Sequence, residues 1–331
     1  MSERIPPEQS SVSKNLRPNE RGLESLSEEE RKAWHLLVPA HKISAIQPES
    51  FTGYDQQAIK RDLEAVEKKE QIFSREGSGE QARTQRRAEL LEAMLNEQIS
   101  AKATKWLGND SESIVASRYD DIFNGVDLIL EMVREEGFKH LALNIDVTSS
   151  PSHLYEKLSG IKEKIRSGTL SRVKYFRSKG TQPKFMGELS NLPKVVIGVD
   201  AKTIRELSML RIDYHTARKG SKLEENGAEI RKSLAKKAGE ALRKMAKHRI
   251  QILIIKEIEL QLHAFSEFAR KHNQEEAASA YESALETIGQ IKASKQSPNN
   301  PDLKIILSQE DAEKNDNDEV YQALALALKD L

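Results

Sequence analysis

Two carboxylates stand at the outer ends of neighbouring apolar runs in the middle of the chain. Residues 127–133 and 140–148 form these runs, and the polar turn between them contains a glycine. Apolar runs of this length on either side of a glycine-containing turn predict a β-hairpin. If the turn centres near Glu136, the numbers of paired residues sum to about 273, which places Asp127 opposite Asp146 to within a residue or two.

Facing carboxylates inside a sheet need an explanation, because directly paired side chains lie roughly 5 Å apart and like charges there are destabilising. A divalent cation between Asp127 and Asp146 supplies one, since carboxylate oxygens are preferred ligands of Mg²⁺ and Mn²⁺. The alternative is that both aspartates lie at solvated strand ends. The alternation in residues 141–148 favours the cation, because one face of this strand is aliphatic and the other carries Ala142, Asn144, Asp146 and Thr148.

Asp121 is a further candidate for the same site. It precedes a turn signal, Asn124-Gly125, and its closeness to Asp127 makes it a candidate metal or water ligand. An acidic residue in such a loop is also a common turn cap, and this alternative stays open.

A long helix expected over residues 80–107 carries another candidate acid. Its apolar stripe recurs at helical spacing and predicts a buried face formed by Leu90, Leu91, Met94 and Leu95. On a helical wheel Glu97 falls at the edge of this stripe, Glu92 lies further round and Glu89 is nearly opposite. Glu97 is therefore the acid expected to face the site, and the alternative is one more surface glutamate.

Composition limits the classes of function. Lys plus Arg and Asp plus Glu both number 52, so a nucleic-acid partner would need a local basic patch. The chain has no cysteine, which excludes disulfides and cysteine-ligated metal sites. No apolar run approaches the length of about 18 residues that spans a bilayer, and the N-terminus has no apolar signal region. We therefore expect a cytoplasmic protein with no membrane partner.

One basic patch is present. Eight Lys and Arg and a single acid lie between Arg231 and Arg249, on a helix expected near residues 222–248. Such a face can bind the phosphates of a nucleic acid, although a basic helix is commonly a solvated face. The candidate nucleic-acid ligands are Lys236, Lys237, Arg243, Lys244 and Lys247.

The remaining elements follow from local patterns. Residues 1–26 and 293–318 are polar and are expected to be disordered, and deleting residues 1–26 and 295–331 should leave thermal stability nearly unchanged. The last residues predict a short amphipathic helix that could dock a protein partner, and the oligomeric state stays open. We expect further helices near 28–38, 56–74, 151–167, 201–211, 250–272 and 273–292, and strands at 114–119, 172–179 and 194–200.

Familiar catalytic motifs are absent: the chain has no phosphate-binding glycine loop, dinucleotide fingerprint, HExxH or Gly-x-Ser-x-Gly. The order helix, strand, Asp-bearing strand, second acidic strand, helix, strand over residues 80–218 resembles the core of the PD-(D/E)XK, or restriction-endonuclease-like, nuclease superfamily. The segments DD-x-x-x-G-x-D and D-x-T also resemble those of bacterial proteins of unestablished function. The resemblance implies an α/β (α+β) fold with an αβββαβ core and a mixed sheet.

The resemblance also implies a metal site and a reaction. Asp127 and Asp146 match the two metal-binding acids of the superfamily, and Glu97 matches an acid often found on its first helix. The implied cofactor is Mg²⁺ or Mn²⁺. The implied activity is metal-dependent hydrolysis of phosphodiester bonds, with the basic helix holding the nucleic-acid backbone.

Thr148 departs from the pattern of the superfamily, which has a lysine at this position. In the superfamily this lysine can come from the following helix, where Lys157 is the first candidate and Lys162 the second. The alternative is a catalytically inactive scaffold, or a nucleic-acid-binding or interaction protein, that keeps the fold without the lysine.

These expectations divide the chain into four parts. An N-terminal arm that is largely disordered or helical (1–79) precedes the nuclease-like core (80–218). A helical extension with the basic helix (219–292) and an acidic, disordered tail with a short terminal helix (293–331) follow.

Overall fold

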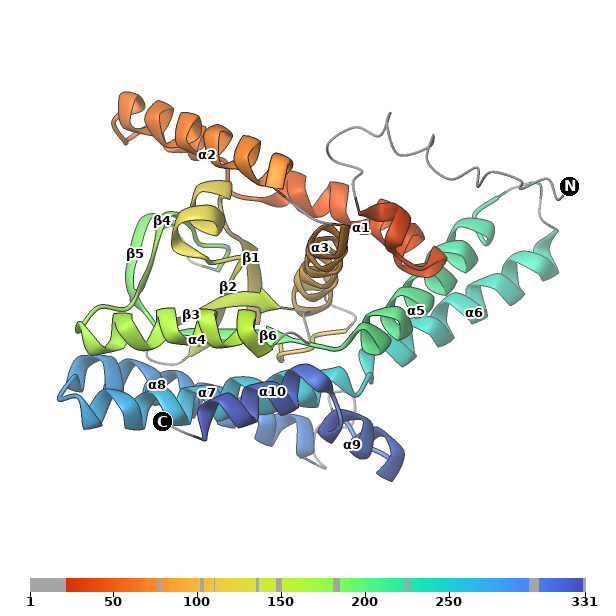
Figure 1. Cartoon of the computed structure of the whole chain (residues 1–331). Coiled ribbons are helices and arrows are strands. Elements are labelled where there is room, and N and C mark those ends of the chain that lie inside the picture. Colours follow the sequence, from red (N-terminus) through yellow and green to blue (C-terminus); the bar gives the residue numbers. More distant parts are fainter. Residues whose placement is uncertain are drawn as a thin grey trace, which may run out of the picture.

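A computed structural model describes residues 22–329 except 77–78, 102–103, 110, 135–136, 147–150, 181–184, 224, 226 and 298–303. The fold is mixed α and β, as expected, and helices make up most of it. A central sheet lies between the N-terminal helices and a layer of C-terminal helices, and one helix pair projects from the side (Figure 1). Within the described residues, no helix is both long and apolar enough to cross a membrane.

The central sheet has four strands in the order β1-β2-β3-β6. The strands β1, β2 and β3 form an antiparallel meander, and β6 pairs with β3 in parallel. A parallel pair needs a crossover connection, which here consists of a helix and a separate hairpin. The bounds are β1 Ser111–Val115, β2 Leu128–Arg134, β3 Gly137–Asp146, α4 Pro151–Arg166, β4 Ser171–Arg177, β5 Met186–Leu192 and β6 Lys194–Gly198.

The central hairpin is close to the predicted one. Leu128 pairs with Leu143 and Arg134 with Gly137, so the turn has two residues. Continuing this register by one residue places Asp127 opposite Asn144, two residues from Asp146 and on the same face of the sheet. The turn is therefore centred slightly earlier than Glu136, within the error that the sequence allowed.

Three N-terminal helices cover one end of the sheet. They are α1 (Glu28–Ser44), α2 (Gln56–Glu76) and α3 (Gly79–Ser100). The capping box that begins α1 at Ser27 is present. The predicted stripe of α3 is buried in the main hydrophobic core. This helix ends at Ser100 rather than at 107, because the chain then turns back and the Trp106 amide donates to the Gln98 carbonyl (3.2 Å).

The C-terminal helix α7 (Ile250–Lys271) protects the open edge of β6. The Val196 amide donates to Gln261 Oε1 (2.8 Å), and Gln261 Nε2 donates back to the Val196 carbonyl (2.5 Å). The Gly198 amide donates to Glu257 Oε2 (3.2 Å). Side chains of a helix thus take the place of a further strand, which satisfies backbone groups that would otherwise be exposed.

The C-terminal tail differs from the prediction of a disordered, separable segment. Residues 309–328 form α9 (Gln309–Asp316) and α10 (Glu319–Leu328), and α10 packs against α7 and α4. Helix α10 is the short terminal helix that the sequence predicts. Because residues 309–316 are helical and Leu324 and Leu328 belong to the main core, the prediction of a disordered, separable tail was wrong. At the other end, Leu23 and Leu26 are also buried, while residues 1–21 lie outside the described part of the chain.

The helices α5 (Ala201–Gly220) and α6 (Ala228–Ala246) pack against each other and project from the body of the molecule (Figure 1). The side chain of Asp200 caps α5, as expected, by accepting from the Thr203 amide (2.8 Å). The last long helix, α8 (Glu275–Gln296), packs along α7.

Candidate functional site

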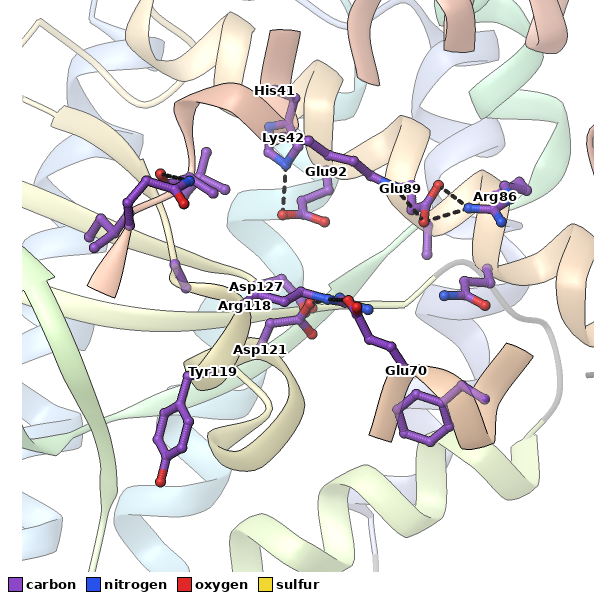
Figure 2. A pocket seen from close by; sticks show the side chains of 18 of the residues that line it. His41, Lys42, Glu70, Arg86, Glu89, Glu92, Arg118, Tyr119, Asp121 and Asp127 are labelled. Atoms are coloured by element: carbon purple, nitrogen blue, oxygen red, sulfur yellow. Dashed lines mark hydrogen bonds and ion pairs between the residues drawn. The ribbon is translucent and has the colours of Figure 1, made fainter. Parts of the chain in front are cut away.

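A cavity of about 760 Å³ lies where the three N-terminal helices meet the end of the sheet. Three residues singled out from the sequence line it: Asp121, Asp127 and Lys157. Asp127 immediately precedes β2, Lys157 projects from α4, and Asp121 lies in a π-helical turn, Asp120–Asn124. Most of the rest of the wall comes from α1, α2 and α3 (Figure 2), and residues from the segments 45–48 and 115–119 complete it. Segments far apart in sequence therefore bring acids and an amine into one cavity.

The two neighbouring aspartates of the turn have different surroundings. Asp120 is fully buried and accepts hydrogen bonds from Ser117 Oγ (2.6 Å) and from the amides of Lys174 (2.7 Å) and Tyr175 (3.1 Å). It therefore holds the turn against β4. Asp121 lines the cavity and is ion-paired with Arg118. The turn-cap alternative thus applies to Asp120, and Asp121 is the one placed for chemistry.

Arg118 connects the turn to α2. Its guanidinium contacts the Asp121 carboxylate and donates through Nε to Glu70 Oε1 (2.6 Å; Figure 2). All three side chains line the cavity. The arginine therefore offsets the negative charge of Asp121 and holds α2 over the cavity.

Glu92 of α3 is the acid that faces the cavity from the first helix of the core. Its Oε1 lies 2.8 Å from His41 Nε2 of α1 (Figure 2). Burial, with the negative charges of Asp121 and Glu89, raises the pKa of Glu92 well above its usual range. Burial also lowers the pKa of His41 to about 4. The protonated form of Glu92 and the neutral form of His41 are therefore the forms that these surroundings favour.

The pKa of Glu89, one turn before Glu92, is shifted in the opposite direction. It accepts from Arg86 Nη1 (2.7 Å) and Lys42 Nζ (3.1 Å). Although burial acts to raise its pKa, these two cations outweigh burial and hold the pKa of Glu89 below its ordinary value. The cavity wall therefore carries one glutamate with a raised pKa and one with a lowered pKa, a separation typical of acid–base sites.

Lys194 is a residue that sequence reasoning missed. It begins β6, and its Nζ donates to the Asn124 carbonyl in the turn that carries Asp121 (3.1 Å). Burial lowers the pKa of Lys194 to about 8, and the charges of Asp127 and Asp121 oppose this shift. A lysine at the start of an apolar strand looks like a boundary residue, so only the fold shows its proximity to the acids.

Two predicted residues lie away from the cavity. Glu97 is paired with Arg211 of α5 (2.6 Å), because the side of α3 that bears Glu89 and Glu92 is turned toward α1 and the cavity. Lys162 is half-buried on α4 and is not part of the cavity wall. Sequence reasoning therefore chose the wrong glutamate of α3 for the cavity.

Asp146 and Thr148 cannot be placed in the cavity in the same way. Asp146 ends β3, paired with Gly198 of β6. Its side chain, and the whole of Thr148, lie outside the described residues. The predicted pairing of two metal-binding aspartates therefore rests on the backbone register alone.

The five basic candidates of α6 are all exposed: Lys236, Lys237, Arg243, Lys244 and Lys247. Helix α6 contributes no residue to the cavity wall. Within the described part of the chain none of the five forms an ion pair with an acid. They constitute a positively charged surface on the projecting helix pair, separate from the cavity.

The donor chemistry at the cavity fits a divalent cation. Carboxylate oxygens are suitable ligands, and the crowding of Asp121, Glu89 and Glu92 is what a nearby cation would relieve. Among the described side chains, no three acidic or histidine residues come close enough together to hold a metal ion by themselves. A complete ligand set would need Asp146 in addition to Asp127.

Comparisons with protein-family models, curated proteins and solved structures find no match to this chain. The function is therefore inferred from the cavity and its residues.

Proposed function

We propose that this chain is a metal-dependent nuclease that hydrolyses phosphodiester bonds of nucleic acid in the cavity. The observation that carries the proposal is the convergence of Asp121, Asp127 and Lys157 on one cavity from three separate elements. The order α3, β1, β2, β3, α4, β6 supports it, because, apart from the hairpin β4–β5 between α4 and β6, it is the αβββαβ order that the resemblance implies. The four-stranded mixed sheet gives further support.

Asp127 and Asp146 would hold Mg²⁺ or Mn²⁺, with Asp121 as an additional ligand. A divalent cation there would polarise a phosphate and lower the pKa of a bound water. The protein's own groups would manage protons and charge. Lys157 Nζ, on the cavity wall, would orient the attacking water or offset the charge of the phosphate.

Lys194 and Glu92 extend this assignment. With a pKa of about 8, Lys194 Nζ is partly neutral at slightly alkaline pH and can accept a proton. When it is protonated, the carboxyl of Glu92 can donate a hydrogen bond or a proton toward a leaving oxygen. Lys157, on the cavity wall, would therefore take the place of the lysine that Thr148 replaces, and Lys194, which contacts the turn of Asp121 and is not part of the cavity wall, is the second candidate.

The first test is hydrolysis of labelled DNA and RNA by the full-length chain with Mg²⁺, Mn²⁺ or EDTA. We expect cleavage only with metal. Metal should also raise Tm, since a ligand at a hundredfold excess over its Kd stabilises the folded state by about 2.7 kcal/mol. Asp127→Asn should remove both effects. Glu97→Gln is the matched control, because Glu97 lies outside the cavity, and it should retain both effects.

A second variant pair separates catalysis from metal binding. Lys157→Met should abolish cleavage and keep the metal-dependent rise in Tm. Lys162→Met, on the same helix but outside the cavity wall, should keep both. If wild type and Asp127→Asn respond identically to Mn²⁺, the cavity is not a metal site and the proposal is wrong.

The exposed cations of α6 favour a second candidate function, nucleic-acid binding without hydrolysis. Neutralising phosphates releases counterions, so binding through this helix should weaken steeply as salt rises. Replacing the five basic residues with alanine should then reduce the salt dependence. Binding that depends on α6, with no cleavage in any metal, would support this function over the first.

A further inference from the structure

We infer that the cavity accepts single-stranded nucleic acid and excludes the duplex. This inference rests on the proposed function, whose substrate class it specifies. The observations that carry it are the depth of the acids, the helices that enclose them and the aromatic groups on the wall.

Glu92 and Asp121 are less exposed than Phe73, which we take as part of the rim of the cavity. The side chain of Glu92 is 19% exposed and that of Asp121 is 33% exposed. Phe73 of α2, also on the wall, is 51% exposed. A phosphate must therefore pass the rim before it reaches the carboxylates. A duplex presents its phosphates on a stiff, wide surface, whereas a single strand can bend one phosphate inward.

Helices enclose the acids on several sides. The wall contains His41 and Lys42 from α1, Glu70 and Phe73 from α2, Glu92 from α3 and Lys157 from α4 (Figure 2). Two sets of contacts fix α2 in this position. Arg118 pairs with Glu70 at one end, and Asp62 accepts from Tyr175 Oη (2.6 Å) and Lys174 Nζ (2.5 Å) nearer the other end. These contacts therefore fix α2 as one wall of the cavity. The space beside the helix suits a narrow, flexible chain.

Part of the wall is apolar and aromatic. Phe73 and Tyr119 line the cavity. The ring of Tyr119 is tilted against Phe123, with centroids 4.9 Å apart, and meets Tyr175 edge-on, so Phe73 is the ring on which a base can stack. Ile46, Pro48 and Leu63 add apolar surface. Unpaired bases stack on such groups, whereas the bases of a duplex are already stacked on one another. The volume of about 760 Å³ lies in the range of sites that enclose ligands of nucleotide size.

Cations on the wall complement the backbone of the strand. Lys42, Arg118 and Lys157 all line the cavity, where they can contact phosphates on either side of the scissile bond. An acidic cavity could instead suit a polyamine. The aromatic surface and these three cations favour the nucleic acid, because each of the cations would repel a polyamine.

The test measures fluorescence anisotropy of a labelled oligothymidylate and of a hairpin duplex of equal length, with the full chain in Ca²⁺. We expect the single strand to bind at least about tenfold more tightly. Phe73→Ala should weaken single-strand binding about tenfold, the scale of one lost stacking contact, and leave duplex binding unchanged. Phe185→Ala is the matched control, since Phe185 is similarly exposed but lies outside the cavity wall, and it should change neither.

Cleavage of the same two substrates in Mn²⁺ separates this inference from the proposed function. Cleavage of the duplex as fast as the single strand would overturn the inference and leave the nuclease function standing. Tight, Phe73-dependent single-strand binding without cleavage would sustain the inference and overturn hydrolysis. Binding of spermidine with no oligonucleotide binding would overturn both.

Discussion

Buried charged groups occur in two regions of this molecule, and the two regions treat them differently. In the C-terminal layer, Arg249 donates to Asn315 Oδ1 (2.8 Å), Thr203 Oγ1 (2.8 Å) and Glu206 Oε2 (3.0 Å). Its own carbonyl accepts from Asn315 Nδ2 (3.1 Å). Every contact is between complementary groups, and together they fasten α9 to α5 and α7.

In the cavity, carboxylates lie beside one another as well as beside cations. Burial, with the negative charges of Asp121 and Glu89, destabilises Glu92 as an anion. The neighbouring His41 has a buried Nδ1 with no hydrogen-bond partner within the described residues. A network that only stabilised the fold would not leave such conflicts, because an unrelieved buried charge costs several kcal/mol. The negative charges around buried Glu92 therefore favour the cavity as the candidate site, whereas the complementary contacts of Arg249 are those of a structural network.

The largest expected effect is a loss of stability when a buried residue of the C-terminal layer is changed. Leu324 of α10 is 1% exposed in the main core, whereas Leu326 of the same helix is 57% exposed. Leu324→Ala should lower the free energy of unfolding by about 2–5 kcal/mol, as other buried leucines do. Leu326→Ala should change it by less than about 0.5 kcal/mol. Urea denaturation followed by circular dichroism measures both. Equal, small effects would mean that α10 does not contribute to the core.

A smaller effect on stability tests the cavity. It is expected to have opposite signs at Glu92 and Glu97, two positions of α3. Glu92→Gln mimics the protonated acid and keeps a hydrogen-bonding group beside His41. Because the folded state raises the pKa of Glu92, wild type loses stability as pH rises above about 4.5, and the variant does not. At pH 8 the variant should be more stable than wild type by about 1 kcal/mol, and at pH 4 the two should be equal.

Glu97→Gln provides the contrast. It removes the anion from Arg211 and leaves that guanidinium without its 2.6 Å partner, so the variant should be less stable than wild type at pH 8. Thermal melts of the three proteins at both pH values measure the effect. A loss of stability in both variants would mean that Glu92 is a structural acid like Glu97.

Local patterns in the sequence predicted the elements that depend on neighbours along the chain. The stripe of α3, the capping residue Asp200 and the hairpin register to within two residues all follow from spacing and turn chemistry. The edge strand β5 was missed, because its sequence, Met-Gly-Glu-Leu-Ser-Asn-Leu, has little β-branched content and most of its side chains are not buried.

Features that depend on distant contacts could not be predicted. The rotation of α3 is set by its packing on α1, which decides that Glu92 rather than Glu97 faces the cavity. The docking of the tail depends on Asn315 meeting Arg249, 66 positions earlier in the chain. Neither contact leaves a periodic signal in the residues themselves. The candidate site was therefore found in part, through Asp121, Asp127 and Lys157, and its remaining members required the fold.

The smallest expected effect compares one lysine from each region. Burial lowers the pKa of both Lys194 and Lys295 to about 8. Lys295 donates to the Lys105 carbonyl (2.9 Å) and to Gln251 Oε1 (2.7 Å), with no acid acting on it. Lys194 is held protonated in part by Asp127 and Asp121. A divalent cation at these aspartates would offset their negative charge, so the pKa of Lys194 should fall below 8 when Mg²⁺ is added, while that of Lys295 stays constant. Side-chain nitrogen NMR against pH, with Lys194→Arg and Lys295→Arg to assign the signals, measures both values. A fall at neither lysine, or an equal fall at both, would mean that the cation does not bind beside Asp127.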